Sequence, residues 1–432
     1  MRITKVAGFA HTLKQKLFSN QLIRNLSWLG SAEIINRIFR LITTVVLARL
    51  LHSYDYGLAA IVLTTNEFVR VFTNNGIWAK LVQAEQKDVQ ELSQTAYSLN
   101  WLICGTLFII QCLVSIPIAW FYQDQRIILP ICVMALIYLI IPFGLVQQSL
   151  VQRENKLHVT ALAGGLTTCI DNILAIILAF LGWGMWAIVL PKVLIAPIWV
   201  LIFYKNHKWR PPKKFTFTKW PEMVHFGKNI LGVELLETFR NNLDYLIAGR
   251  FLGVESLGIY YFAFNAGLGI SLSVINALDM ALLPHLCSVR SDLGKFKQNY
   301  LKSLKTIAFI IIPLVVLQSS LAPFYVPIIF GKQWIVAIPI LILICLSAIP
   351  RPFANAASQS LWTLDKPQWD FHWNLGFTAI FATALLIGVQ WNIFGLAIGV
   401  LATHAIALPI YTFVVTLYVL RKQPSHREVV AK

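Results

Sequence analysis

The sequence predicts an all-helical protein that crosses a membrane many times, and two observations carry this prediction. The 432-residue chain is 57% hydrophobic and only 13% charged, with a mean hydropathy of +0.67. A soluble domain is typically about half apolar and about a quarter charged. Apolar blocks of roughly twenty residues also recur along the whole chain, and a helix of that length spans a bilayer. A transmembrane β-barrel would show shorter, alternating segments, so that alternative is excluded.

Comparison of the apolar blocks with the polar loops, in chain order, predicts about twelve transmembrane helices in two groups of six. The expected segments of the first group are Ser27–Leu50, Tyr56–Val82, Ala96–Phe121, Ile127–Val151, His158–Leu181 and Gly184–Tyr204. Those of the second group are Val224–Ala248, Leu257–Pro284, Leu304–Ile329, Ala337–Trp362, Phe371–Val389 and Trp391–Leu420.

These helices imply two lobes, 26–204 and 224–421, joined by a basic linker, 205–223. Residues 1–25 form a basic amphipathic N-terminal segment that we expect either at the inner leaflet or in solvent, and 422–432 form a tail. An even number of spans and basic segments at both ends predict that both termini are cytoplasmic. The chain is therefore expected to be a multi-pass protein of a cell membrane.

The formal charge of +17 invites an interpretation as a nucleic-acid-binding protein. The lysines and arginines, however, gather in alternate loops, such as KNHKWRPPKK and RSDLGKFKQNYLKSLK. This distribution is typical of membrane topology. We therefore expect membrane lipids, and no nucleic acid, among the partners.

An internal repeat is visible when the chain is compared with itself. Each matching pair is separated by 201 positions: Arg49 and Arg250, Leu51 and Leu252, Gly57 and Gly258, Glu33 and Glu234, Asn75 and Asn276. Both halves start on the same side, so the repeats are parallel, an arrangement known from transporters. The repeated corner is interpreted as structural, because Gly57 and Gly258 would let one helix start close to its neighbour.

Ionisable side chains at membrane depth are costly and are concentrated in the first two helices of each half. Glu33, Arg37 and Arg40 follow each other at steps of four and three, which places them on one helix face. Symmetry would place these helices around one central cavity, where arginines suit a pyrophosphate and amides suit sugar hydroxyls. The candidate substrate-binding residues are Arg37, Arg40, Arg70, Asn74, Asn75, Arg240, Asn241 and Asn276.

Carboxylates in the same helices are candidates for a coupling ion: Glu237, Asp244, Glu33, Glu234 and Asp279. The alternative is that Glu33–Arg37 and Glu67–Arg70 are internal salt bridges only. Asp171, Asn172 and His404 are expected to be isolated polar groups in other helices.

Motifs that would indicate catalysis are missing from the sequence. There is no G-x-x-x-x-G-K-[ST] loop, no H-E-x-x-H and no G-x-S-x-G. The six cysteines lie in apolar blocks without C-x-x-C spacing, which favours neither a metal site nor a disulfide framework. We expect no cofactor, no metal and no enzymatic activity.

Two motifs resemble a known family. VVLARLLHSYDYGLAAIV in the first half, and LDYLIAGRFLGVESLGIYYFAFN followed by ALLPHLCSVRSDLGKF in the second, are similar to the oligosaccharide flippases of bacterial polysaccharide export, often called Wzx. The resemblance extends from about Leu26 to Leu420. These flippases belong to a superfamily that also contains multidrug-extrusion transporters and lipid II flippases. The remaining helices match only in pattern.

The resemblance implies a V-shaped bundle of two six-helix lobes that translocates undecaprenyl-pyrophosphate-linked sugar units for O-antigen, capsule or exopolysaccharide. It also implies a polysaccharide polymerase and a chain-length regulator as candidate partners. Lipid II flippases have two further C-terminal helices, which weakens that assignment. The alternatives are a cation-coupled multidrug-type antiporter, whose cavity should be more acidic, and a scaffold for glycan enzymes that transports nothing.

Overall fold

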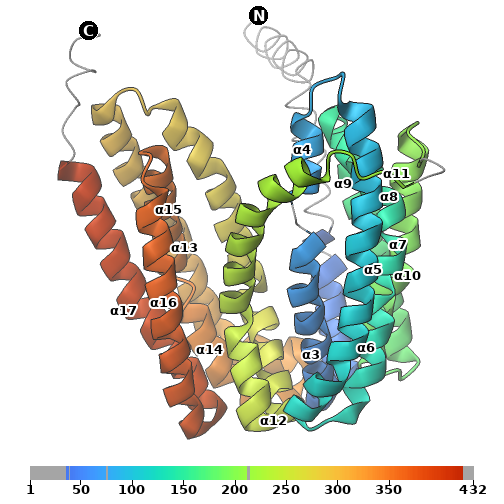
Figure 1. Cartoon of the computed structure of the whole chain (residues 1–432). Coiled ribbons are helices and arrows are strands. Elements are labelled where there is room, and N and C mark those ends of the chain that lie inside the picture. The colour runs from blue at the N-terminus through green and yellow to red at the C-terminus, as the bar shows by residue number, and fades with distance from the viewer. Residues whose placement is uncertain (1–35, 38, 74–75, 212–214, 422–432) are drawn as a thin grey trace, which may run out of the picture. The chain divides into compact units, whose positions relative to one another are not determined.

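The computed structural model describes residues 36–37, 39–73, 76–211 and 215–421, and within these ranges it contains helices and no strand (Figure 1). Six of the described helical segments are long and apolar enough to cross a membrane, and up to eight qualify if each of two bent pairs counts as one span. Every described part of the predicted segments contains helix. The prediction of a polytopic helical membrane protein is therefore confirmed.

The helices follow one another with short connections. The first group contains α3 (Ser53–Arg70), α4 (Ile77–Gln83), α5 (Val89–Tyr122), α6 (Ile128–Ala135), α7 (Ile137–Ile140), α8 (Pro142–Arg153), α9 (Leu157–Phe180), α10 (Trp186–Leu194) and α11 (Ala196–Asn206). The second contains α12 (Trp220–Ser288), α13 (Leu293–Tyr325), α14 (Ile338–Leu346), α15 (Arg351–Thr363), α16 (Pro367–Gly388) and α17 (Asn392–Arg421).

Several of the predicted spans are broken rather than straight. Helix α12 covers two of them and changes direction at Gly253, whose φ of 83° lies in the left-handed region that glycine tolerates. The span Gln125–Arg153 bends by 53° before Pro142, the first residue of α8. Proline fits there because the first turn of a helix does not need its N–H groups for internal bonds.

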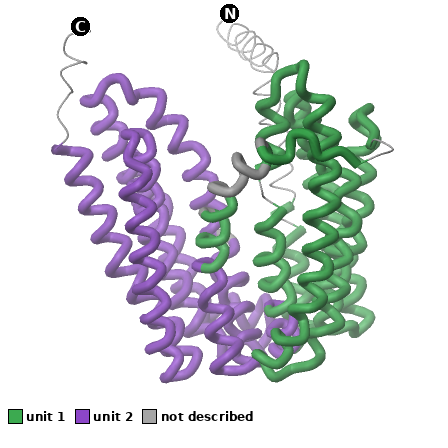
Figure 2. Tube along the Cα trace, in the orientation of Figure 1, with its two compact units in different colours: residues 1–52, 61–239 green, residues 53–60, 240–432 purple. Residues whose placement is uncertain are grey.

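The chain separates into two compact units, shown in Figure 2. The first holds the described residues up to His52 together with Ile61–Phe239, and the second holds Ser53–Ala60 and the described residues from Arg240 onward. The units therefore divide inside α12, later than the predicted start of the second lobe at 224. The short segment Ser53–Ala60, which opens α3, groups with the second unit.

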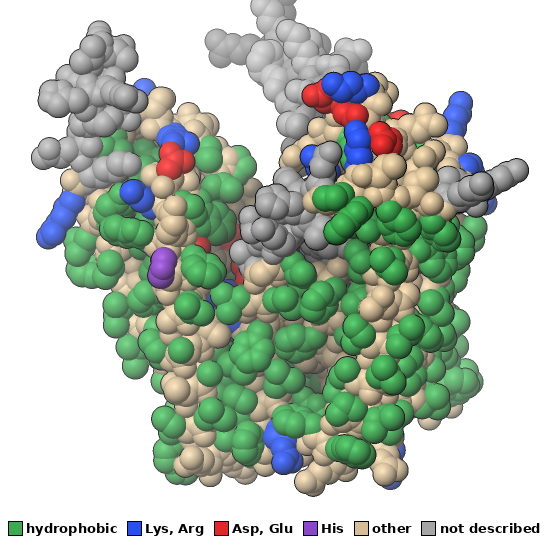
Figure 3. Space-filling view, viewed as in Figure 1, with side chains coloured by type: hydrophobic (Ala, Val, Ile, Leu, Met, Phe, Trp, Pro, Cys, Tyr) green, Lys and Arg blue, Asp and Glu red, His purple; other side chains and the backbone are tan. Residues whose placement is uncertain are grey.

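Large apolar side chains cover the outside of the helices, as Figure 3 shows for one face. Phe309 on α13 is 82% exposed and Trp120 on α5 is 73% exposed. Exposed apolar surface on this scale would be unfavourable in water and is what a bilayer requires. Inside the first unit, Leu81, Leu99 and Leu150 pack together with Met223, so the start of α12 is part of that unit's core.

Candidate functional site

The repeated glycine corner is a close crossing of two chain segments within the second unit. A Cβ atom built on Gly57 would lie 2.8 Å from the carbonyl carbon of Val254, and its oxygen is closer still. A Cβ atom on Gly258 would lie 2.8 Å from the backbone nitrogen of Gly57 and would overlap the carbonyl of Ser53. Ser53 and Val254 are themselves 201 positions apart, so the contact is reciprocal. The structural interpretation of these glycines is confirmed.

Side chains around this crossing reinforce it. Ser53 Oγ donates a hydrogen bond to Glu255 Oε1 at 3.2 Å. The buried ring of Tyr56 packs edge-on against Phe262 and Trp334, with centroid distances of 6.1 and 5.2 Å. The corner is thus a packed joint between the two repeats.

The arginines predicted to bind substrate in the first half lie at the surface of the first unit. Arg40 and Arg70 are exposed and Arg37 is half-buried. Within the described residues, the guanidinium groups of Arg40 and Arg70 have no ion pair. Glu33, Asn74 and Asn75 lie outside the described residues, so the Glu33–Arg37 salt bridge is not tested.

One of these arginines, Arg70, borders a polar cluster. The hydroxyl of Tyr138 donates to Asn66 Oδ1 at 3.1 Å and lies 3.3 Å from the Asn66 carbonyl oxygen. Arg70 interacts electrostatically with the same tyrosine. Asn66 and Tyr138 are buried, so this contact holds the last turns of α3, the helix that ends at Arg70.

Arg240, predicted as the substrate arginine of the second half, takes part in a hydrogen-bonded network inside the second unit. Its guanidinium donates to Asn374 Oδ1, and Asn374 Nδ2 donates to Asp370 Oδ1 at 3.0 Å. Asp370, only 7% exposed, also accepts hydrogen bonds from three side chains: Ser358 at 2.6 Å, Tyr411 at 2.8 Å and Trp362 at 2.9 Å. A buried carboxylate with four donors is fully satisfied.

Asp244, a candidate for the coupling ion, is buried in the same unit. Its Oδ2 accepts from the hydroxyl of Tyr260 at 2.8 Å, and its Oδ1 accepts from the backbone N–H of Tyr245 at 3.0 Å. Arg351, at the start of α15, interacts electrostatically with Asp244, Tyr260 and Arg240. Asp244 therefore has donors and a cation supplied by the protein itself.

The other predicted residues of the second half are exposed or half-buried. Asn241, Asn276 and Glu237 are exposed, and Glu234 is half-buried. Asp279 is half-buried and accepts a hydrogen bond from Asn355 Nδ2 at 2.6 Å. The structure thus brings Arg240 and Asp244 into one polar interior with Arg351.

Two groups that were expected to be isolated have partners, and that prediction was wrong. Lys192 Nζ lies 3.3 Å from Asp171 Oδ2, which makes an ion pair between α10 and α9. His404 is buried between the rings of Phe377 and Phe381, with its Nδ1 2.8 Å from the carbonyl oxygen of Val400. Charged and polar groups in an apolar helix are costly alone. Asp171 has its partner on the next helix, and His404 has its partner in the backbone of its own helix.

The linker between the halves is held on the first unit. We call residues 207–211 and 215–223 the strap. The ring of Phe215 stacks on Tyr97 with an interplanar angle of 11°, and the N–H of Thr216 donates to Ser98 Oγ at 2.9 Å. Lys219 Nζ lies 2.8 Å from Asp88. This hydrogen bond lowers the pKa of Asp88 and raises the pKa of Lys219.

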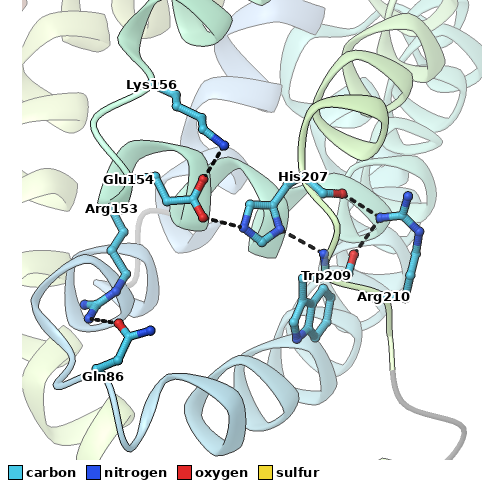
Figure 4. A network of polar contacts seen from close by, with 7 residues as sticks. All are labelled: Gln86, Arg153, Glu154, Lys156, His207, Trp209 and Arg210. Carbon is cyan, nitrogen blue, oxygen red and sulfur yellow. Dashed lines mark hydrogen bonds and ion pairs between the residues drawn. The ribbon is translucent and has the colours of Figure 1, made fainter.

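The first part of the strap is fixed by the network in Figure 4. His207 Nδ1 accepts from the N–H of Trp209 at 3.0 Å, so the ring proton sits on Nε2, which lies 3.3 Å from Glu154 Oε1. Burial lowers the pKa of His207, which keeps the ring neutral. A hydrogen bond from Lys156, followed by the interaction with His207, lowers the pKa of Glu154.

In the same network, Arg153 closes the end of α4. Its Nη1 donates to the carbonyl oxygens of Val82, at 3.1 Å, and of Ala84, and its Nη2 lies 3.3 Å from Gln86 Oε1. The last carbonyl groups of a helix have no partner within it, and a cation there also complements the helix dipole. The cluster in Figure 4 therefore holds the strap in place, and its two arginines are bound to backbone carbonyl groups and to Gln86.

Sequence reasoning missed the core of the polar interior: Arg351, Asp370, Asn374 and Tyr411. Arg351 follows Pro350 in a segment assigned to the middle of one long span, and Asp370 lay just outside the predicted helix start at Phe371. The spacing of Asp370 and Asn374, four residues apart, is the signal that could have placed them on one face.

Comparison with known proteins adds the family. The family described as "Polysaccharide biosynthesis protein" matches residues 46–339. The teichuronic acid biosynthesis protein TuaB of Bacillus subtilis is 24% identical over 379 residues, which cover 86% of this chain and 77% of that protein. The lipopolysaccharide biosynthesis protein WzxC of Escherichia coli is 25% identical over 396 residues, which cover 89% of this chain and 78% of that protein. The predicted resemblance is confirmed.

Solved structures share the fold. The lipid II flippase MurJ, in an inward closed conformation, superposes with a TM-score of 0.71 at 15% identity, covering 93% of this chain and 89% of that chain. An inward-facing multidrug resistance transporter of the MATE family gives a TM-score of 0.69 at 14% identity, covering 89% and 94%. At these identities the likeness concerns the fold, which is that of polytopic helical transporters.

Proposed function

The chain belongs to the polysaccharide biosynthesis protein family, and from this premise we propose that it is a flippase for lipid-linked oligosaccharides. Its substrate is an oligosaccharide joined through pyrophosphate to undecaprenol, and it moves the sugar from one leaflet of the bacterial inner membrane to the other. The glycan serves O-antigen, capsule or exopolysaccharide synthesis. The protein works by alternating access and catalyses no covalent step.

This proposal rests on two arginines, Arg40 and Arg70. Both are exposed, and neither guanidinium group forms an ion pair within the described residues. Both lie in or next to apolar helices, where an uncompensated cation is unfavourable unless a ligand anion meets it. A guanidinium offers a planar fork of donors that matches a phosphate group. A pyrophosphate carried by a membrane lipid meets both requirements.

Further residues are assigned to the same substrate. Arg37, Arg240 and the amides of Asn74, Asn75, Asn241 and Asn276 would contact the pyrophosphate or the sugar hydroxyls. Glu33, Glu234, Glu237, Asp244 and Asp279 would serve ion coupling. Arg240 already donates to Asn374, so its share in substrate binding would require it to exchange that partner.

The topology is part of the proposal. With both termini in the cytoplasm, the strap is cytoplasmic and the turn at Trp183 is extracytoplasmic. In a variant without the six native cysteines, a single cysteine at Trp183 should react with an impermeant maleimide in intact cells, and one at Lys205 should react only after the cells are permeabilised. Labelling of both from outside would contradict the assignment.

The function is tested with purified protein in proteoliposomes that contain undecaprenyl-pyrophosphate-linked oligosaccharide in one leaflet. Appearance of the sugar in the other leaflet is measured by its accessibility to an added glycosidase. We expect protein-dependent flipping of the glycan-bearing lipid. Extrusion of cationic drugs without flipping would favour a multidrug antiporter, and neither activity would favour a non-transporting scaffold.

A further inference from the structure

Two buried oxygen atoms in the second unit have no hydrogen-bond donor. They are the two carboxylate or amide oxygens in this position among the described residues of the unit, Asp279 Oδ1 on α12 and Gln359 Oε1 on α15; the hydroxyl oxygens of Tyr56, Ser319 and Tyr325 are also without a partner. Asp279 and Gln359 both lie in segments that are long and apolar enough to cross a membrane. A buried acceptor without a donor is unfavourable, and native proteins rarely leave one uncompensated. Here two occur in neighbouring residues, because the Gln359 side chain contacts the backbone of Asp279.

The donors around these two oxygens are already used elsewhere. Asn355 Nδ2 donates to the other carboxylate oxygen, Asp279 Oδ2, at 2.6 Å. Gln359 Nε2 donates to the backbone carbonyl of Asp279 at 3.2 Å. This bond fixes the orientation of the Gln359 amide, because a flipped amide would place its oxygen against that carbonyl. Gln359 is only 7% exposed, so water does not replace the missing donor freely.

No positive charge compensates Asp279 within the described residues, where it forms no ion pair. This distinguishes it from the other buried acids of the unit. Asp370 accepts from four side chains, and Asp244 accepts from Tyr260 with Arg351 nearby. The two unpaired oxygens are acceptors, and the negative charge of Asp279 has no cation beside it in the described part of the chain, so a small cation would satisfy both the oxygens and the charge.

We propose that Asp279, Gln359 and Asn355 form a binding site for a small monovalent cation that is held by oxygen atoms, either Na+ or a proton. Na+ would be bound by Asp279 Oδ1 and Gln359 Oε1 directly. A proton would bind to Asp279 Oδ1 and turn it into a donor, for which Gln359 Oε1 is an available acceptor. The proposal rests on the proposed transport function, in which this site couples cation movement to the movement of the glycan.

Titratable groups on the helices packed around α15 are engaged with other partners. Asp370 of α16 accepts a hydrogen bond from Tyr411 of α17, and the hydroxyl of Tyr300 of α13 lies 3.0 Å from the hydroxyl of Thr416. His404 Nδ1 of α17 lies 2.8 Å from the carbonyl oxygen of Val400, and Cys287 Sγ of α12 lies 3.8 Å from the hydroxyl of Thr363. Arg351 on α15 itself interacts with Asp244, and His285 on α12 is exposed. A response to pH or Na+ that disappears with Asp279 therefore belongs to this site.

The test uses the purified full-length protein in detergent, without substrate, and measures the midpoint of thermal unfolding. NaCl is compared with choline chloride at equal ionic strength, and each salt is examined over a series of pH values. In the Asp279→Asn variant the amide imitates the occupied site, because its Nδ2 can donate to Gln359 Oε1. Glu85→Gln, which changes an exposed carboxylate beside Lys87, is the matched control.

For a sodium site, we expect NaCl to raise the midpoint of the wild type and of the control, and to leave Asp279→Asn unchanged. For a proton site, acidification raises the midpoint irrespective of Na+, and the variant again does not respond. Gln359→Met keeps the carboxylate and should raise the half-saturating Na+ concentration, or the acidity required, by roughly tenfold. This second variant keeps the test valid if Asp279→Asn does not fold.

A wild type that responds to neither Na+ nor pH would overturn the proposal, and so would an equal response in Asp279→Asn. Because no glycan is present, these results are independent of flipping. Failure of the cation site would leave the flippase assignment intact, and failure of the flipping assay would leave a demonstrated cation site.

Discussion

The two units keep their charges in different places. In the first, Arg40 and Arg70 lie exposed without ion pairs among the described residues, whereas in the second, Arg240, Asp244 and Asp370 are tied into a hydrogen-bonded interior. The repeated sequence would suggest equal roles for corresponding helices. The repeat thus kept the glycine contact between helices in both halves. These charged residues differ: those of the first unit are exposed, and those of the second are hydrogen-bonded within its interior.

The two halves share the glycine corner, and substitutions in this corner should have the largest effect on the amount of folded protein. Replacement of Gly57 or Gly258 by Leu would force a side chain into the backbone of the other repeat, which cannot move without separating the helices. We expect either variant to be lost from the membrane fraction, as measured by immunoblot of the tagged protein. Gly105→Leu is the control, because an added Cβ there meets no atom within 4 Å. Normal accumulation of both corner variants would refute the reciprocal joint.

The interior of the second unit should show the next largest effect. Asp370→Ala would leave Ser358, Tyr411, Trp362 and Asn374 without their shared acceptor, and loss of one member of a buried charged network costs roughly 3–5 kcal/mol. Arg70→Ala in the first unit removes an exposed charge and should cost at most about 1 kcal/mol. Chemical unfolding of the two purified variants measures the difference. Equal destabilisation would remove the distinction between the units.

The strap should show a small, pH-dependent effect. Because the folded pKa of Asp88 is lowered, its stabilising bond to Lys219 is present above the ordinary aspartate pKa of about 4 and is lost as the pH falls through the folded value. Acidification should therefore lower the protection of the amides of residues 215–223, measured as exchange relative to the intrinsic rate at the same pH, and Asp88→Asn should lower it already at neutral pH. Glu85→Gln should not. Equal protection in the wild type, Asp88→Asn and Glu85→Gln would show that the bond between Asp88 and Lys219 does not hold the strap.

Much of this organisation could be predicted from the sequence, for identifiable physical reasons. Apolar blocks predict the helices because only helices satisfy all backbone polar groups within such a segment in lipid. The glycines at 57 and 258 predicted a close helix approach, whereas the structure was needed to show that each meets the other repeat. The partners of Asp171 and Asp370 could not be predicted, because they come from other helices whose rotation the sequence does not determine. For Glu33, Asn74 and Asn75, the site assignment stays a prediction.

Binding of undecaprenyl pyrophosphate to the purified protein tests the central claim most directly, namely that the exposed arginines of the first unit meet the substrate's pyrophosphate. Equilibrium binding is measured for the wild type, Arg40→Ala and Arg40→Lys, each with its thermal midpoint as a check on folding. We predict that Arg40→Ala weakens binding by roughly tenfold or more at an unchanged midpoint, because a charge-assisted contact is lost. Lys should restore it only in part, since the planar fork of donors is missing. Unchanged affinity in Arg40→Ala would contradict the account.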